Sequence, residues 1–264
     1  MEYWWLYLGI GALVGFMAGL LGIGGGMILV PILVFVFGAS GFSGEHIMHL
    51  ALATAMATIP FTSLSSVRAH HARGGVDWKI VRGMLPGLAL GAALGTLVAG
   101  SIPGRPLAIF FAAFIFYAAT SMFFDLTPKG KRALPGLPGL ALAGTVVSFL
   151  ASFLAAGAAF MTIPFMLWCS VPLKRAVGTA GAIGFPLSLA ASVGYVLAGM
   201  AASGLPHYSL GYVYLPAMGM IALLSVLTAP LGARLSHRMP VKRLRIVFAV
   251  TLYGLAARML ANLW

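Results

Sequence analysis

The sequence has few charged residues, and acidic residues are the scarcest. Only 8% of its 264 residues are charged, with 4 aspartates and glutamates against 16 lysines and arginines. A soluble globular domain is about 25% charged, so these polar residues cannot cover a surface that faces water. The scarcity of charge therefore excludes an ordinary cytosolic enzyme, a secreted domain and a disordered chain.

Cysteine and catalytic motifs are also scarce. The single cysteine, Cys169, excludes an internal disulfide framework. The chain contains no His-Glu-x-x-His, Cys-x-x-Cys or Gly-x-Ser-x-Gly motif. We therefore expect no enzyme activity, no metal and no cofactor. The first residues lack the basic stretch of a signal peptide, and we treat them as mature sequence.

Apolar residues make up 61% of the chain, and the mean hydropathy is +1.03. Glycines, prolines and charge clusters divide them into ten segments, at residues 3–21, 27–37, 46–67, 80–100, 106–124, 137–154, 160–170, 176–199, 210–233 and 244–263. A membrane-spanning helix needs about 20 apolar residues, and all but two of the segments reach roughly that length. The sequence therefore predicts an all-α polytopic membrane protein.

The two short segments, 27–37 and 160–170, would each form a helix of about 16 Å, at 1.5 Å per residue. Each follows a longer apolar run with no charged linker between them. We therefore predict two broken helices near the membrane midplane. Each would consist of a long helix, a break inside the membrane and a short helix.

Basic residues separate the connections into two groups. Lysine and arginine gather after the third, fifth and ninth segments and before the eighth, at Arg68, Arg73, Lys79, Arg82, Lys129, Lys131, Arg132, Arg234, Arg238, Lys242, Arg243, Lys174 and Arg175. Residues 38–45 and 200–209 contain none. Because basic loops remain in the cytoplasm, we expect a multi-pass membrane protein with both termini outside. This pattern explains the net charge of +12 by orientation rather than by nucleic-acid binding.

The second half of the chain resembles the first at an offset of 133 residues (164 − 31). Aligning residues 16–31 with 149–164 gives the identities Phe16/Phe149, Ala18/Ala151, Leu21/Leu154, Gly24/Gly157 and Pro31/Pro164. Each half then holds five segments, and an odd number inverts the second half. We predict two inverted transmembrane repeats, 1–124 and 137–264, joined by a basic cytoplasmic linker at 125–136. Such repeats are typical of transporters, although helices rich in glycine and alanine can also align by composition alone.

Glycine occupies four of the five positions 22–26. Glycine weakens a helix, and a break frees backbone N–H groups that then need partners. With the positive end of the following helix dipole, these groups form an anion site; the alternative is close helix packing through small residues. The predicted substrate-binding residues at the two breaks are Gly24, Gly25, Gly26 and Met27, with Gly157 and Ala158 in the second copy.

Three threonines are further candidates for substrate binding. Thr54 and Thr58 precede Pro60 in the third segment, and Thr179 precedes Pro186 in the eighth. Their hydroxyls could donate to an anion beside the glycine break. The alternative is that they bond to carbonyls of their own helices, as threonine often does in membrane helices.

Acidic residues are absent from the interior of every predicted span, since the four in the chain are Glu2, Glu45, Asp77 and Asp125. An intramembrane carboxylate is the usual proton or sodium relay of a pump, and a cationic substrate would also need one. The absence favours an anionic or neutral substrate. Coupling could use a proton of the substrate or a sodium ion held by carbonyls, and the sequence does not decide between them.

Residues 19–31, Gly-Leu-Leu-Gly-Ile-Gly-Gly-Gly-Met-Ile-Leu-Val-Pro, resemble the signature of the TauE/SafE sulfite exporter family, also called the toluene sulfonate uptake permease family. The stretches at 53–54, 70–78 and 178–179 are similar to that family as well, and the resemblance covers about residues 8–259. It implies transport of small sulfur-containing anions such as sulfite, sulfoacetate and organosulfonates, in the bacterial inner (plasma) membrane. The second copy departs from the pattern, because Ala158 and Ala159 stand where glycines are usual.

These observations lead to one functional hypothesis and its alternatives. We expect an exporter or permease of small sulfur-containing anions that works by alternating access about the broken-helix N-termini. The alternatives are a passive anion channel, which would use the same site, and a non-transporting intramembrane enzyme or scaffold. The expected partners are the anion and the lipid bilayer, with no nucleic acid; the sequence leaves open whether the chain forms a homo-oligomer.

Overall fold

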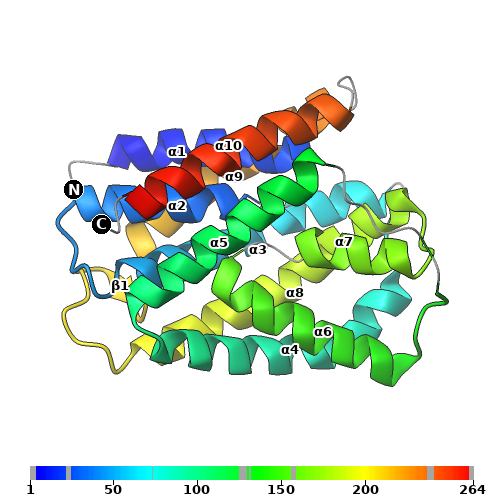
Figure 1. Ribbon diagram of the computed structural model, residues 1–264, viewed down its shortest axis with the longest axis horizontal. Helices are drawn as coiled ribbons and strands as arrows, with labels where there is room; N and C mark the ends of the chain where they lie inside the picture. The colour runs from blue at the N-terminus through cyan, green and yellow to red at the C-terminus, as the bar shows by residue number, and fades with distance from the viewer. Residues whose placement is uncertain are drawn as a thin grey trace.

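The computed structural model describes residues 4–21, 25–72, 74–124, 130, 132–155, 159–236 and 241–261. Over these residues the chain forms ten α-helices and one short hairpin (Figure 1). The helices are α1 (Trp4–Leu21), α2 (Gly26–Ala39), α3 (Ile47–His71), α4 (Trp78–Ser101), α5 (Gly104–Phe123), α6 (Leu137–Leu154), α7 (Ala159–Trp168), α8 (Leu173–Gly199), α9 (Leu215–Ser236) and α10 (Val241–Ala261). The antiparallel strands are β1 (Ser209–Leu210) and β2 (Val213–Tyr214).

The ten helices correspond one to one to the ten predicted apolar segments, which confirms the prediction of an all-α protein. The start of the ninth segment is the exception, because residues 210–214 belong to the hairpin and α9 begins only at Leu215. Gly211, with a φ of +53°, allows the turn between the strands. Pro216 lacks an N–H and so fits the first turn of a helix.

Six of the described helices are long and apolar enough to cross a membrane: α3 to α6, α8 and α9. Over the described residues the other four contain shorter apolar stretches of 10–17 residues. Leucine and phenylalanine side chains lie exposed on the outer helices, as at Leu97, Phe116 and Leu227. This apolar outer surface suits contact with lipid.

Helix α1 packs along α9 through small residues. Its glycines recur every four residues and face α9 residues with the same spacing: Gly11 lies against Ile221, Gly15 against Ser225 and Gly19 against Ala229. Because the two series increase together, the helices run parallel. A side chain at any of these glycines would collide with the α9 backbone, so the spacing allows two helices to approach closely in the membrane.

Helices α4 and α6 pack in the same way. Gly87 lies against Ala141, Gly91 against Thr145 and Gly95 against Phe149. These two helices are therefore also parallel to each other, and Figure 1 shows them running opposite to α1 and α9.

Helices α3 and α8 pack against each other at the centre of the bundle (Figure 1). Helix α3 also contacts α2 and α9, whereas α8 contacts α7 and α4, and α5 packs against α10. Three of these pairs have a counterpart in which five is added to or subtracted from both helix numbers. The pairs α1–α9 and α6–α4, α3–α9 and α8–α4, and α2–α3 and α7–α8 correspond in this way.

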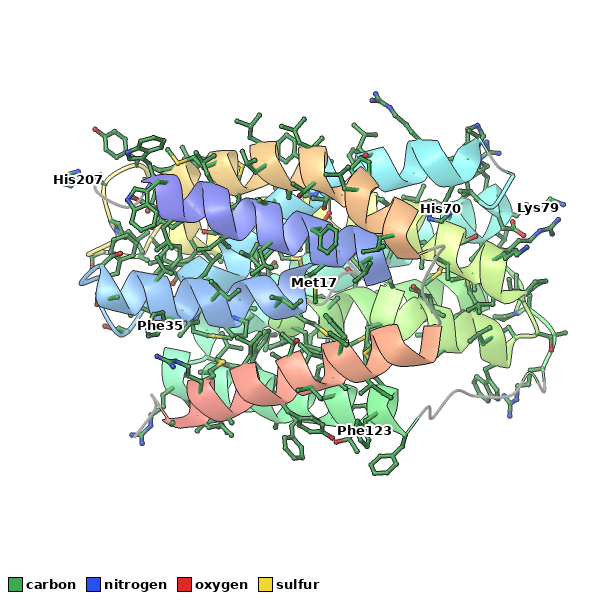
Figure 2. All side chains as sticks on the ribbon, turned by 90° about the horizontal axis from the view of Figure 1, so that it is seen from above. Met17, Phe35, His70, Lys79, Phe123 and His207 are labelled. Atoms are coloured by element: carbon green, nitrogen blue, oxygen red, sulfur yellow. The ribbon has the colours of Figure 1, made fainter. Side chains whose placement is uncertain are left out.

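The bundle has two chemically different ends. The hairpin end contains β1, β2 and the start of α3, and Figure 2 shows Phe35 and His207 near it. The basic end lies opposite, where Figure 2 shows His70 and Lys79. Its exposed cations include Arg68, Arg82, Lys174 and Arg175.

Candidate functional site

The start of α2 and the end of α6 meet inside the bundle. A Cβ atom on Gly26 would collide with the carbonyl oxygen of Ala155 and lie 3.3 Å from Cδ1 of Ile59. Ala155 follows the last residue of α6, is fully buried and has a left-handed φ of 42°. Only glycine leaves room for this contact between the two backbones.

The first turn of α2 carries backbone N–H groups into this buried junction. The carbonyl of Gly25 accepts from the N–H groups of Ile28 at 3.2 Å and Leu29 at 2.9 Å. The N–H groups of Gly26 and Met27 come too early in the helix to have an intrahelical acceptor. All of these residues are buried, and the first turn contains no acidic residue. The positive end of the helix dipole therefore lies in the interior without a carboxylate to neutralise it.

The start of α7 is the corresponding place in the second half. Helix α6 ends at Leu154 and α7 begins at Ala159, again with no acidic residue in the first turn. Ala159 and Thr162 are buried. The predicted site residues that fall outside the described part of the chain are Gly24, Gly157 and Ala158.

Thr58 lies beside the junction but uses its hydroxyl within α3. It precedes Ile59, whose side chain approaches Gly26. Its Oγ1 donates to the carbonyl of Ala55 at 2.7 Å. In this arrangement Thr58 offers an anion no free donor, which matches the alternative stated for the threonines.

The structure does not bring Thr54 and Thr179 together. Oγ1 of Thr54 accepts from the backbone N–H of Tyr214 at 3.0 Å, at the hairpin end. Oγ1 of Thr179 accepts from the backbone N–H of Asp77 at 2.9 Å, at the basic end. Both threonines are fully buried. Each therefore ties a central helix to the residue that precedes a helix of the other half, α9 for Thr54 and α4 for Thr179.

The connection at the basic end is built from capping and close backbone packing. The Asp77 carboxylate caps α4, because its Oδ1 accepts from the N–H groups of Lys79 at 3.0 Å and Ile80 at 3.4 Å. A side chain on Gly178 would collide with the carbonyl of Gly75. The segment before α4 thus lies directly on α8.

The connection at the hairpin end is built from aromatic rings. The Tyr214 ring packs edge-on against Phe42, Phe37 and Tyr7, with ring centroids 5.2, 5.7 and 6.3 Å away. The Tyr212 ring stacks on His49, with centroids 4.9 Å apart and planes 25° apart. The hairpin therefore covers the start of α3.

Sequence reasoning missed His49 and the role of the hairpin. A signal for His49 was present, because an ionisable side chain inside a predicted span is rare and points to function. Tyr212 and Tyr214 gave no such signal, since both lie inside an apolar segment that reads as helix. Among the described residues, no group of three or more histidine, cysteine, aspartate or glutamate side chains could hold a metal ion.

Comparison with known proteins identifies the family of this chain. The family model described as sulfite exporter TauE/SafE matches residues 7–259. A probable membrane transporter protein of Haemophilus influenzae is 32% identical over 259 residues, covering 96% of this chain and 97% of its own. One from Methanocaldococcus jannaschii is 27% identical over 248 residues, covering 91% of this chain and 89% of its own. No solved structure matches the chain significantly. The chain therefore belongs to the TauE/SafE sulfite exporter family, and it is a multi-pass integral membrane protein.

Proposed function

We propose that this protein is a secondary transporter of small sulfur-containing anions, such as sulfite or an organosulfonate, in the bacterial inner membrane. The observation that carries the proposal is the buried start of α2 at Gly26, packed against the end of α6 at Ala155. Family membership supports a transporter, and this junction is the part of the molecule best suited to an anion.

The anion preference rests on the electrostatics of the junction. The N–H groups of Gly26 and Met27 have no acceptor within α2, and the helix dipole places partial positive charge there. No acidic side chain occurs in the first turn of either α2 or α7. A sulfite or sulfonate oxygen accepts hydrogen bonds from such N–H groups, as anions do at helix N-termini.

Two inverted halves are the second element of the proposal. The packing of α1 along α9 has its counterpart in the packing of α6 along α4, and the two parallel pairs run in opposite directions. The bond from Tyr214 to Thr54 has its counterpart in the bond from Asp77 to Thr179. Both correspondences support an inverted repeat, with the interruptions between α1 and α2 and between α6 and α7 as the broken elements.

The two threonine bonds supply a mechanism for alternating access. With the basic end in the cytoplasm, as the positive-inside rule predicts, Thr179 would hold the inner side closed and Thr54 the outer side. Rocking of one half against the other would release one bond while the other remains. Thr54 and Thr179 would then act on access to the anion site rather than bind the anion directly.

Flux of labelled sulfite into proteoliposomes tests the proposal. We expect saturable uptake that unlabelled sulfite or an organosulfonate inhibits, and that Gly26→Val abolishes. Gly219→Val is the matched control, because the space around Gly219 on α9 is open. Flux of a cation without saturable flux of any sulfur anion would overturn the substrate class. A non-saturating, electrogenic conductance would instead replace alternating access with a passive anion channel.

A further inference from the structure

His49 is a buried histidine beneath the hairpin. It lies in the first turn of α3 and is only 3% exposed. Its Nε2 atom lies 3.1 Å from the carbonyl oxygen of Ala99 and 3.1 Å from that of Ile102. Because carbonyl oxygens only accept hydrogen bonds, Nε2 carries a proton and donates it to both. These contacts determine which nitrogen is protonated when the ring is neutral.

The other ring nitrogen of His49 is buried without a partner. Its Nδ1 atom has no hydrogen bond with any residue that the structure describes, and the same is true of Nδ1 of His46. The two ring centroids are 6.2 Å apart. On the neutral His49 ring, Nδ1 carries a lone pair that can accept a proton. A proton added here would create a buried charge, which is costly.

The Tyr212 side chain covers the imidazole ring of His49. It stacks on His49, while the N–H of Tyr214 on the same hairpin bonds to Thr54. Tyr212 carries no charge, because burial raises the pKa of its phenol and the nearby Glu45 raises it further. Lifting the hairpin would uncover His49 and admit water to it.

The groups around His49 come from four elements. His46 precedes α3 and Glu45 precedes His46, while Tyr212 faces the ring from the hairpin. Helix α4 contributes only the carbonyls at its C-terminal end, which favour a positive charge nearby. At the start of α5, Gly104 lies against the backbone of Glu45, and Arg105 follows it. Glu45 and Arg105 are both exposed and of opposite sign.

We propose that His49 is a proton-binding site and that its protonation is linked to undocking of the hairpin. In the docked arrangement the His49 ring is buried, so an added positive charge is poorly solvated, whereas the undocked arrangement exposes the ring to water. The proton therefore binds better to the undocked form, and by linkage a lower pH favours that form. A role of this proton in driving transport rests on the proposed function; the linkage itself does not.

A nitroxide spin label on the hairpin tests the linkage without any substrate. Leu210→Cys places the label on an exposed position of β1, in a Cys169→Ala background that removes the chain's single cysteine. We expect the mobile fraction in the electron paramagnetic resonance spectrum to rise by about twofold or more from about pH 8 to pH 5, the range in which histidine changes charge.

Substitutions at two histidines identify the group responsible. Glutamine at position 49 can still donate to the carbonyls of Ala99 and Ile102 but does not titrate, so His49→Gln should abolish the pH response. His207→Gln, at an exposed position near the hairpin, is the matched control and should retain it. A pH response that survives His49→Gln, or the lack of any response in the parent, would overturn the proposal.

Nuclear magnetic resonance of ¹⁵N-histidine provides a second measurement, which stays informative if the variant folds poorly. The chain has six histidines, and glutamine variants of the other five assign the signal of His49 by elimination. We expect Nε2 protonated and Nδ1 unprotonated at neutral pH, with Nδ1 gaining a proton on acidification. A proton on Nδ1 at neutral pH, or no change down to about pH 5, contradicts the proposal. Failure of sulfite flux together with these responses would reject only the proposed substrate.

Discussion

The hairpin end and the basic end use the same hydrogen bond in different surroundings. At both ends a buried threonine of a central helix accepts a backbone N–H from the residue that precedes a helix of the other half. At the hairpin end aromatic rings and a buried histidine surround the bond. At the basic end a capped helix start and close glycine packing surround it. The shared hydrogen bond suits the proposed role of closing each side of the transporter. The different surroundings suit different regulation of the two sides, with a buried histidine at the hairpin end.

The junction between the two ends should be the most sensitive part of the molecule. In Gly26→Val, the added side chain meets the carbonyl of Ala155, and overpacking of this kind costs about 1–3 kcal/mol. We expect sulfite flux to be abolished, because the added side chain displaces the start of α2 from Ala155, and the unfolding temperature to fall too. Wild-type flux and stability in this variant, measured beside Gly219→Val, would show that the contact is dispensable.

Loss of the hydrogen bond at Thr54 should affect only the hairpin end, and loss of the one at Thr179 only the basic end. Thr54→Val and Thr179→Val each keep the side-chain shape but leave a backbone N–H unpaired, which costs about 1–3 kcal/mol. We expect Thr54→Val to increase the mobility of a spin label at residue 210 and Thr179→Val to increase the maleimide labelling of Cys169. The serine variants, which keep the hydroxyl, should behave like wild type. If each valine variant perturbs both ends equally, the ends do not close independently.

The cap on α4 should affect the basic end alone. Asp77→Ala removes the carboxylate that accepts from Lys79 and Ile80, and loss of such a cap costs about 1 kcal/mol. We expect a lower free energy of unfolding with an unchanged spin-label spectrum at residue 210. Asp77→Asn retains an oxygen acceptor and should lose little. Equal losses in the two variants would mean that the charge, rather than the cap, is what stabilises this end.

The smallest expected effect is on the thiol reactivity of Cys169, which follows α7 at the basic end. Burial raises the pKa of its thiol, and the guanidinium of Arg132 partly opposes this. A raised pKa leaves less thiolate at neutral pH, so maleimide labelling should be slow there and should rise into alkaline pH, above the ordinary value of about 8.5. Arg132→Ala should slow labelling further at a given pH, whereas cysteine at the exposed residue 210 should label quickly. Faster labelling of Cys169 in Arg132→Ala would contradict this account.

The helices were predictable because the composition leaves few alternatives. Apolar runs of about 20 residues can satisfy their backbone in lipid only as helices or closed barrels, and the predicted segments match the ten helices. The hairpin was not predictable, because residues 210–214 are as apolar as the span that follows them. Its structure depends on the turn at Gly211 and on rings from distant parts of the chain, such as Phe37.

The candidate site was predictable only in part. Glycines at 25 and 26 marked the start of α2, since this residue type permits a break and a close backbone approach. That Gly26 would meet Ala155 had no sequence signal, because Ala155 is an ordinary alanine whose left-handed φ arises from its place after α6. The threonines were identified as polar groups within spans, yet their partners, Tyr214 and Asp77, lie more than 100 residues away.

By itself the sequence determined that the chain enters a membrane and where its helices lie, because hydropathy and backbone propensity act over neighbouring residues. Only the tertiary structure decided which polar groups meet. It brought the start of α2 at Gly26 to Ala155, placed Thr54 and Thr179 at opposite ends, and buried His49 under Tyr212. Such pairings depend on how the helices pack together, and no local property of the chain encodes them.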